Sequence, residues 1–323
     1  MNRLEKLDTL VANNKRAAGL IAAGAVGYVA LKALSKVACL FKRFILPGYN
    51  LIERYGKGSY AAVTACTDGI GKGFVLELAK RGFNLAMFVR NVEKAQELVE
   101  EIKKTINDKI DVKIVQIDFL KVHQPGVVQA AIKQVEDIDI SLLVNNAGMS
   151  LINKLSIESF TEEELSNMIV FNIYSQVLFT FYLLPKLRSR GKKSGIVNLS
   201  SVSTIISMPA FHMYSGTKVF NDYFSKSMGE EYKGIIDVLS LKPAYVDTPL
   251  VSQIKEKKLC ISPQECANAA LNNLGRYEET NGHYKHMFAS FIQNMFKSAI
   301  NNKLRKICQV QREKIQLPQD KVF

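Results

Sequence analysis

The sequence has few cysteines, and they do not form short pairs. There are five among 323 residues, and no CxxC pair occurs. Zinc sites and disulfide frameworks need closer or even-numbered sets of cysteines. The sequence therefore predicts no metal site and no disulfide framework, and it favours a reducing compartment for the folded part. The five are Cys39, Cys66, Cys260, Cys266 and Cys308.

Two other patterns are also absent. No segment repeats at the spacing of solenoids or propellers, and no basic region is interleaved with aromatic residues at the spacing of a nucleic-acid motif. The formal net charge is nevertheless +13, which fits an anionic membrane, phosphorylated ligands or simply a solvated basic surface. We expect no nucleic-acid partner. The apolar fraction of 47% is ordinary for a globular core.

The N-terminal region lacks an uncharged run of full membrane-spanning length. Ala17–Leu31 carries no charge, but it is shorter than the about 20 residues that a spanning helix needs. Lys32 and Lys36 interrupt the apolar stretch, which continues to Phe41, and their long side chains can reach the membrane interface. A membrane-anchor helix is the leading interpretation. A cleaved signal peptide and an amphipathic interfacial or core helix are the alternatives.

From Tyr60 onward, short apolar segments alternate with helical ones. This alternation predicts a doubly wound parallel sheet of the Rossmann type, with helices on both faces. Strands buried on both faces read as nearly unbroken apolar runs, as they do here. We expect strands at Tyr60–Ala65, Asn84–Val89, Val112–Ile117, Ile140–Val144, Gly195–Leu199 and Ile235–Leu241. We expect one helix that follows the first strand and ends near Arg81, and further helices at Glu93–Ile106, Gln124–Glu136, Glu162–Leu187 and Ala210–Tyr232.

The chain divides by composition into three parts. We expect an N-terminal anchor and linker over residues 1–47, a Rossmann-type domain over 48–285, and a C-terminal amphipathic helix with a basic tail over 286–323. Core or dimer packing and a membrane-surface or substrate-covering helix are the two interpretations of the C-terminal stripe. Its apolar members recur at helical spacing: Phe288, Phe291, Ile292, Met295, Phe296, Ile300 and Leu304.

A glycine-containing turn follows the first predicted strand. The segment 64–71 leaves that strand and opens a helix, with Gly69 and Gly71 inside it. Glycines let the backbone approach a pyrophosphate, and a helix N-terminus offers unpaired N–H groups and the positive end of its dipole. An ordinary strand–turn–helix corner is the alternative.

Two further strand ends carry informative residues. Arg90 directly follows the second strand, where NAD-specific sites place an acidic residue; an arginine there can pair with a 2′-phosphate and so favours NADPH. The fourth strand ends in Asn145-Asn146-Ala147-Gly148. Small residues there leave room for a cofactor, and asparagines can brace neighbouring strands or form a turn.

A tyrosine and a lysine form the candidate acid–base pair. Tyr214 and Lys218 are four residues apart at the start of a predicted helix, so they share one face. An ammonium near a phenol lowers the phenol's pKa of about 10. Ser201, at the end of a strand, can reach the same substrate oxygen, whereas Ser200 should point to the opposite side. A surface Tyr–Lys pair is the alternative interpretation.

Asn172 lies inside the long predicted helix Glu162–Leu187, where asparagine is unfavourable. We expect its amide to hold a water between Lys218 and bulk solvent. The alternative is a helix asparagine that bonds a neighbouring carbonyl.

Taken together, in this order and spacing, these patterns resemble the short-chain dehydrogenase/reductase family from about Tyr55 to Tyr284. The resemblance implies an NADP(H)-dependent oxidoreductase in which the position of Asp118 meets the adenine and that of Thr248 meets the nicotinamide carboxamide. It implies a catalytic set of Asn172, Ser201, Tyr214 and Lys218, and a cofactor site of Thr64, Asp68, Gly69, Ile70, Gly71, Arg90, Asp118, Asn146, Ala147, Gly148, Tyr214, Lys218, Pro243, Val246 and Thr248.

The chain is most similar in detail to the very-long-chain 3-oxoacyl-CoA reductase / 17β-hydroxysteroid dehydrogenase branch. The similarity rests on Tyr55-Gly56, Thr67 to Lys72, and Glu230-Glu231-Tyr232. It implies NADPH-dependent reduction of a lipid carbonyl, with a 3-oxoacyl-CoA of fatty-acid elongation as the leading substrate and a steroid or retinoid as the alternative. It also implies an endoplasmic reticulum membrane location with the catalytic domain facing the cytosol, a homodimer, and elongation-complex partners.

Two positions depart from the family pattern. Ala65 stands where the first glycine is usual, and Ala244 follows Pro243 where glycine is common. A methyl group at Ala65 narrows the conformations open to the turn, which keeps a non-catalytic, nucleotide-binding membrane scaffold as an alternative function. The sequon that starts at Asn198 lies in a predicted buried strand, so we expect no glycan there.

Overall fold

The computed structural model describes residues 14, 17–32, 34–35, 46–151, 154–249 and 260–313. Contacts divide the chain into two units, Met1–Pro47 and Gly48–Phe323. In the first unit, Ala17–Lys32 is an apolar helix with every side chain exposed. The end of the predicted anchor (residues 36–41) and the tail from residue 314 lie outside the described residues.

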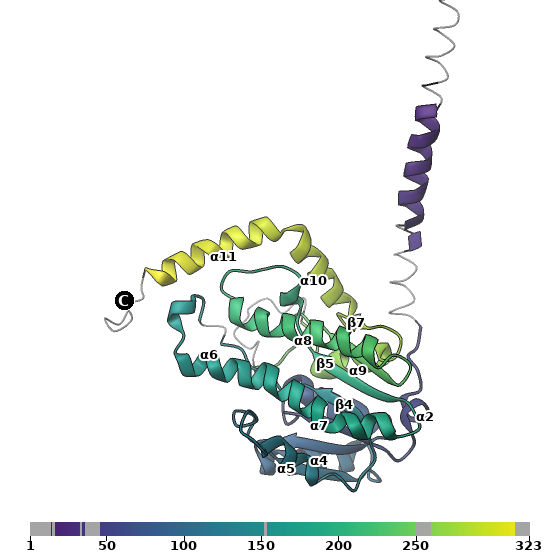
Figure 1. The fold of residues 1–323 in the computed structure, drawn as a ribbon, viewed down its shortest axis with the longest axis vertical. Helices are drawn as coiled ribbons and strands as arrows, with labels where there is room; N and C mark the ends of the chain where they lie inside the picture. The colour runs from purple at the N-terminus through teal and green to yellow at the C-terminus, as the bar shows by residue number, and fades with distance from the viewer. Residues whose placement is uncertain are drawn as a thin grey trace, which may run out of the picture. The chain divides into compact units, whose positions relative to one another are not determined.

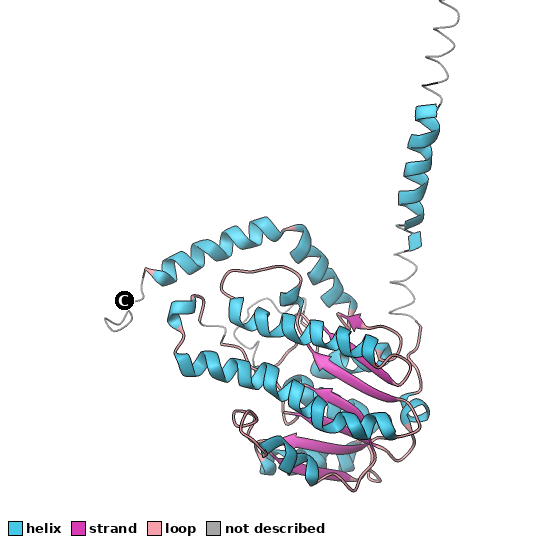
Figure 2. Ribbon diagram, viewed as in Figure 1, coloured by secondary structure: helices cyan, strands magenta, loops and turns pink. Residues whose placement is uncertain are grey.

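A seven-stranded sheet forms the centre of the second unit (Figures 1 and 2). Its order is β3-β2-β1-β4-β5-β6-β7, and all neighbouring strands run parallel. The order reverses between β1 and β4, which is where ligands bind in such sheets, outside the carboxyl ends of the strands. The strands are β1 Tyr60–Thr64, β2 Asn84–Val89, β3 Val112–Gln116, β4 Ile140–Asn145, β5 Ser194–Leu199, β6 Ile236–Leu241 and β7 Glu279–Thr280.

Helices cover both faces of the sheet, as the alternating sequence pattern predicts (Figure 2). One core joins the sheet to α2, α3, α4 and α9, and the other joins it to α5, α7 and α8. The helices are α2 Leu51–Tyr55, α3 Gly69–Lys80, α4 Val92–Thr105, α5 Val127–Lys133, α6 Glu162–Ile169, α7 Ser175–Ser189, α8 His212–Glu231, α9 Pro263–Asn273, α10 Tyr284–Met295 and α11 Lys297–Arg312, with 3₁₀ turns at Ile157–Ser159 and Val202–Thr204.

Strand side chains alternate between the two cores. Val63 of β1 lies in the first core and Ala62 in the second, and both are fully buried. Because both faces are covered, the strands need apolar residues at nearly every position. On the first face α3 and α9 come very close at Gly73, where a Cβ atom would lie 2.3 Å from the carbonyl oxygen of Pro263. Only glycine allows this approach.

The long helix predicted at Glu162–Leu187 is interrupted. A π-helical turn at Val170–Tyr174 separates α6 from α7. The combined helix is long and apolar enough to cross a bilayer, but its α7 part packs against β4 and β5 as a core helix. The prediction of one regular helix was therefore wrong at the turn that contains Asn172.

The C-terminal stripe forms two helices, α10 and α11, which meet at Phe296. Four residues of α10 form an exposed row: Tyr284, Phe288, Phe291 and Met295 are each more than half exposed. Core packing was therefore the wrong interpretation for this face of α10. The second helix, α11, is partly covered at Cys308, whose thiol contacts the Leu155 carbonyl at 3.4 Å.

Candidate active site

The expected site residues gather at one edge of the sheet. They follow β1, β2, β3, β4, β5 and β6, all at the carboxyl ends of the parallel strands. The sequence predicted this arrangement because consecutive motifs sat at consecutive strand ends. The site is thus built from loops that a single rigid sheet holds in place.

The turn between β1 and α3 forms a cradle in which two positions are glycines, so that no side chain covers the backbone there. Gly69 has a φ of +51°, and a Cβ atom there would lie 3.1 Å from the Thr248 methyl group. At Gly71 a Cβ would lie 2.5 Å from the Asn146 amide nitrogen and 2.7 Å from the Ala65 carbonyl oxygen. Both positions therefore require glycine. With the N-terminus of α3 beside it, this cradle fits the pyrophosphate of a dinucleotide.

Ala65 adopts the backbone conformation that favours glycine. Its φ is +52°, in the left-handed region, which costs a residue with a Cβ about 1–2 kcal/mol. The sequence anticipated a narrowed turn at this position. The turn keeps the backbone conformation that glycine would adopt there. The alanine at this position therefore strains the turn and does not change the course of the backbone.

Two side chains tie the ends of β1 and β4 together. The Thr64 hydroxyl accepts hydrogen bonds from the backbone N–H groups of Asn146 (2.9 Å) and Ala147 (3.0 Å). The Asn146 amide donates to the carbonyls of Thr64 and Ala65, both at 2.9 Å. These bonds fix the switch-point crevice. Deeper in the sheet Asn198 is fully buried and donates to Ser225, which agrees with our rejection of its sequon.

Charged residues line the side of the cradle next to β2. Asp68 caps α3 by accepting from the Gly69 N–H at 2.7 Å, and its carboxylate pairs with Lys94 at 2.9 Å. The hydrogen bond from Lys94 is the largest of the influences that lower the pKa of Asp68. Arg90 is exposed directly after β2. Lys94 therefore offsets the acidic charge of Asp68 beside the expected 2′-phosphate position.

Ser201 and Ser200 point to different partners, as the strand alternation predicts. The Ser200 hydroxyl donates to the Lys218 carbonyl at 2.8 Å, within the α8 packing. The Ser201 hydroxyl accepts from the Ser203 N–H at 3.1 Å, and the Ser201 side chain lowers the pKa of Tyr214 against the effect of burial. Ser201 is thus the serine that shares a site with Tyr214.

Tyr214 and Lys218 lie together at the start of α8. The Lys218 Nζ is 5.8 Å from the Tyr214 ring centre and donates to the Leu199 carbonyl at 3.0 Å. It also reaches the end of β4, since a Cβ at Gly148 would lie 3.0 Å from it. Lys218 is only 4% exposed.

The pKa values of this pair depart from the sequence-based prediction. We predicted that Lys218 lowers the pKa of Tyr214, but burial raises that pKa and only the Ser201 hydrogen bond opposes the rise. Burial also lowers the pKa of Lys218 to about 8. The reason is that both groups leave water, and removal from water disfavours each charged form. A protonated phenol is the form that a proton donor needs.

Asn172 is fully buried in the π-helical turn. Its Oδ1 accepts from the Met149 N–H at 2.7 Å, and its Nδ2 donates to the Met149 carbonyl (3.0 Å) and the Thr217 hydroxyl (2.9 Å). Both amide hydrogens are therefore used. The side chain joins the end of β4 to α8 next to Lys218, and the role of this amide in ordering a water stays a prediction.

The loops after β3 and β6 complete the rim. The Asp118 carboxylate accepts from the Leu120 N–H at 3.0 Å and is partly buried. The Pro243 carbonyl accepts from the Val202 N–H at 3.1 Å, which links this loop to Ser201. Val246 pairs with Ile261 in an isolated bridge, and Thr248 touches the glycine cradle. Ile70, the remaining member of the predicted set, is half-buried in the cradle.

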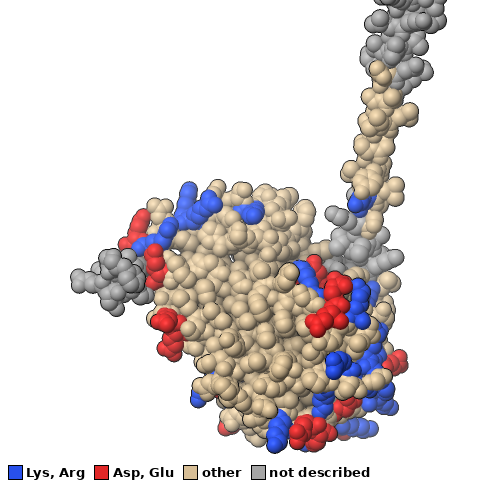
Figure 3. Space-filling model, in the orientation of Figure 1, with Lys and Arg blue, Asp and Glu red and all other residues tan. Residues whose placement is uncertain are grey.

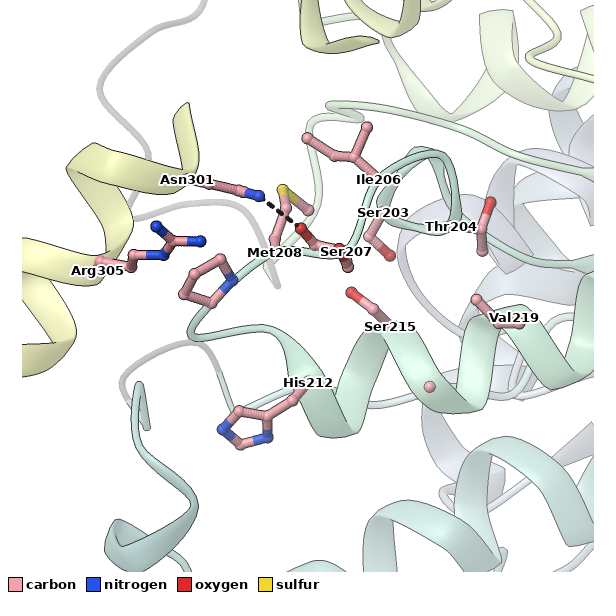
Figure 4. Close-up of a pocket in the computed structure, with 12 residues that line it drawn as sticks. Ser203, Thr204, Ile206, Ser207, Met208, His212, Ser215, Val219, Asn301 and Arg305 are labelled. Atoms are coloured by element: carbon pink, nitrogen blue, oxygen red, sulfur yellow. Dashed lines mark hydrogen bonds between the residues drawn. The ribbon is translucent and has the colours of Figure 1, made fainter. Parts of the chain in front are cut away.

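A cavity of about 590 Å³ lies between the 203–209 loop, α8 and α11 (Figure 4). Its lining includes Ser203 and Ser215, the residues two after Ser201 and one after Tyr214, and Arg305 from α11. A cavity of this size is ordinary for a small-molecule site.

Sequence reasoning missed several residues of the site. Lys94 was signalled only by its position four residues after Arg90, and Thr217 only by standing next to Lys218. No local pattern signals the cavity, because it joins segments far apart in the chain: the Asn301 amide donates to the Ser207 carbonyl at 3.0 Å. Only the tertiary fold brings these residues together.

Known proteins share both the sequence and this architecture. A sequence profile described as short chain dehydrogenase matches residues 59–259. Very-long-chain 3-oxoacyl-CoA reductase-B of Danio rerio is 34% identical over 260 residues, covering 77% of this chain and 79% of the relative. Hydroxysteroid dehydrogenase-like protein 1 of Gallus gallus is 34% identical over 243 residues, covering 73% and 71%.

Solved structures repeat the fold. A 7β-hydroxysteroid dehydrogenase is 24% identical with a TM-score of 0.67, covering 76% of this chain and 94% of its own. The 3-ketoacyl-(acyl-carrier-protein) reductase of Brucella melitensis, solved with NADH, is 25% identical with a TM-score of 0.58, covering 68% and 92%. The chain is an oxidoreductase and belongs to the short-chain dehydrogenase family.

Proposed function

We propose that this enzyme uses NADPH to reduce the keto group of a 3-oxoacyl-CoA, as in fatty-acid elongation. The observation that carries the proposal is the group of Ser201, Tyr214 and Lys218 at the end of β5 and the start of α8, with Lys218 Nζ 5.8 Å from the Tyr214 ring centre. Relatives named very-long-chain 3-oxoacyl-CoA reductase, which this chain matches over most of their length, support the choice of substrate. A non-catalytic scaffold would not need this group.

The proposed mechanism divides the chemistry among three side chains. Bound NADPH would supply the hydride. Tyr214 donates a proton to the substrate oxygen, and its raised pKa keeps the phenol protonated for this step. Ser201 hydrogen-bonds the same oxygen, and Lys218 places positive charge beside Tyr214 and would hold the ribose of the cofactor. General acid catalysis of this kind contributes about 10²–10⁴-fold.

We also propose which residues bind the cofactor, from their positions in the structure. The glycine cradle, the Thr64–Asn146 brace and the strand-end residues Asp118 and Thr248 surround the crevice in which a dinucleotide lies in this fold. Arg90, exposed directly after β2, favours NADPH over NADH, because a guanidinium can bind a phosphate through two parallel hydrogen bonds.

A steroid or retinoid ketone is the second candidate substrate. The chicken relative named hydroxysteroid dehydrogenase-like protein 1 is as similar to this chain as the zebrafish reductase. To decide, full-length protein and NADPH are incubated with a 3-oxoacyl-CoA, a steroid ketone and retinal, and the products are identified by mass spectrometry. We expect 3-hydroxyacyl-CoA. Steroid alcohol or retinol as the only product would replace the proposal with the second candidate.

We further propose attachment to the endoplasmic reticulum membrane. The exposed apolar helix Ala17–Lys32 supports an anchor; it is about 24 Å long, against about 30 Å of bilayer hydrocarbon. The exposed row on α10, followed by Lys297, Lys303 and Lys306 on α11, supports a second contact with an anionic lipid surface. The catalytic domain would face the cytosol, where NADPH and lipid-soluble acyl substrates meet.

The absence of tryptophan makes this contact directly testable. Phe291→Trp on α10 and Tyr223→Trp on α8 introduce single reporters at positions 61% and 75% exposed. In full-length protein on vesicles that contain brominated lipid, we expect quenching of the first reporter and none of the second. Equal quenching would assign no special contact to α10.

Resistance of the full-length protein to alkaline carbonate washing, lost on deletion of residues 1–43, tests the anchor.

The wider organisation is also a proposal. Residues 1–47 would be anchor and linker, 48–285 the reductase domain, and 286–323 a C-terminal segment, although α10 runs across the last boundary. Exposed Phe181 on α7 and Tyr223 on α8 support a homodimer through these helices, which light scattering in detergent would test. Elongation-complex partners are tested by cross-linking in the membrane.

A further inference from the structure

Helix α10 (Tyr284–Met295) has one buried side chain, and that side chain is polar. His286 is 0% exposed and is the single buried residue of this helix. The rest of α10 is partly or fully exposed, and it contains one charged residue, Lys285 (Figure 3). A helix on the surface of a domain is ordinarily held by a stripe of buried apolar residues. An imidazole in this place therefore attaches α10 in a different way.

His286 is bonded to the loop that follows β6. Its Nε2 lies 2.9 Å from the Tyr245 carbonyl oxygen. A carbonyl oxygen can only accept, so Nε2 carries the hydrogen and donates it. Burial lowers the pKa of His286, so the ring is neutral at pH 7 and has this one N–H to give. The helix is thus joined to the loop by a directed bond, which an apolar side chain of the same size could not make.

The same loop carries three members of the proposed cofactor site. Pro243, Val246 and Thr248 all lie within three residues of Tyr245. The Tyr245 carbonyl also accepts from the Ile261 N–H at 3.2 Å, so it is held on two sides. Because Tyr245 stands in the middle of this short segment, its position sets where the flanking residues lie.

A second bond holds the loop from the turn that leads into α10. Asn281, three residues before the helix, donates from Nδ2 to the Lys242 carbonyl at 3.1 Å. Lys242 and Tyr245 are themselves three residues apart. The start of the loop is therefore tied at both ends to the segment 281–286.

We propose that His286 is a positioning residue for the nicotinamide end of the cofactor. It acts through the Tyr245 carbonyl and holds the loop 243–248 where Thr248 can meet the carboxamide. The inference rests on the proposed function, because it takes the NADPH site from there. It gives α10 a role in a site to which none of the helix residues was assigned: the helix fixes the loop that receives the nicotinamide.

The test uses two ligands that differ only in the nicotinamide group. NADPH and 2′-phospho-ADP-ribose share the adenine, the phosphates and both riboses, but the second has no nicotinamide. Their dissociation constants are measured by calorimetry on the full-length protein, as wild type, His286→Leu and His286→Gln. Glutamine places an amide N–H as far from the backbone as Nε2 and can replace the bond, whereas leucine cannot. His123→Leu, at an exposed histidine in the loop after β3, is the matched control.

We expect His286→Leu to raise the dissociation constant of NADPH by about 5–30-fold, and that of 2′-phospho-ADP-ribose by less than about twofold, because only the nicotinamide loop loses a bond. His286→Gln should recover most of the NADPH affinity, and His123→Leu should change neither constant. A purely structural role would affect both ligands alike.

Two results would overturn the inference. They are an unchanged NADPH affinity in folded His286→Leu, and an equal loss for the two ligands. If that variant does not fold, as judged by circular dichroism, Asn281→Ala removes the neighbouring bond instead, and the same selective loss of NADPH affinity is required. Wild-type protein that binds neither ligand would overturn the proposed cofactor, so the two failures are distinguishable.

Discussion

The two sides of the active site are built differently. On the cofactor side, the β1–α3 turn (residues 65–71) is held by the paired side chains of Thr64 and Asn146. On the side of the 203–209 loop, here called the substrate side, a cavity is lined by this loop, α8 and α11, which are segments far apart in the chain. A site for a ligand that never changes can be closed by internal bonds.

The difference decides what the sequence could predict. The cofactor side follows from local patterns: a glycine turn after a strand, Arg90 after the next strand, and small residues after β4. The substrate side depends on contacts such as Asn301 with Ser207, which no local pattern encodes. Mutations on the cofactor side should therefore act on all substrates alike.

The largest expected effect lies where the two sides meet. Tyr214→Phe keeps the ring and removes only the proton-donating hydroxyl. We expect turnover to fall by about 10²–10⁴-fold, with NADPH affinity nearly unchanged, since the ring and Lys218 remain. Steady-state kinetics and a fluorescence titration measure the two quantities. Substantial reductase activity in this variant would remove Tyr214 from the role of proton donor.

A smaller effect should be confined to the cofactor side. Arg90→Asp replaces the positive charge after β2 with a negative one, so we expect the preference for NADPH over NADH to narrow or reverse, by about 10–100-fold in the ratio of dissociation constants. The ratio of kcat/KM between two acyl substrates should stay constant. Wild-type protein that binds NADH as tightly as NADPH would contradict this role for Arg90.

The charge state of Lys218 should appear in the pH dependence. Its pKa of about 8 means that it is charged below that pH and neutral above it, so kcat/KM for NADPH should be level below pH 8 and fall by about tenfold per unit above it. Tyr214, with its raised pKa, stays protonated over this range. A profile that is level to pH 10 would contradict the assignment.

Stability should change in the opposite direction. The unfolded chain carries Lys218 with its ordinary pKa, so between pH 8 and about 10.5 the unfolded state binds more protons than the folded state. The contribution of Lys218 to the free energy of unfolding therefore rises with pH while activity falls. The difference in unfolding free energy between wild type and Lys218→Met, followed across this range, isolates that contribution.

The smallest effect is expected at Ala65. Relief of its positive φ should make Ala65→Gly more stable by about 0.5–1 kcal/mol, after allowance for the greater freedom of glycine in the unfolded chain. Ala244→Gly, at the other departure from the family pattern, has no positive φ to relieve and is the control. Chemical denaturation measures the free energy of unfolding of both variants. A gain in stability for Ala244→Gly but not for Ala65→Gly would contradict this account.

Much of the fold and of the cofactor side was predictable because strand burial and strand ends leave local signals. The sheet, its helices and the different directions of Ser200 and Ser201 follow from periodicity. The π-helical turn at Asn172 and the shifted pKa of Tyr214 do not, because they arise from burial against distant segments. The break at Phe296 and the exposed face of α10 were missed for the same reason.

The central claim is that this enzyme selects a 3-oxoacyl-CoA, and internal competition tests it most directly. Full-length protein is given equal concentrations of a 3-oxoacyl-CoA and a steroid ketone with limiting NADPH, and both products are quantified from the same tube. The product ratio then equals the ratio of kcat/KM values. We predict that 3-hydroxyacyl-CoA exceeds steroid alcohol by at least about 100-fold, a discrimination that enzymes reach by binding one transition state more tightly than another. A ratio near one, or an excess of steroid alcohol, would contradict the account.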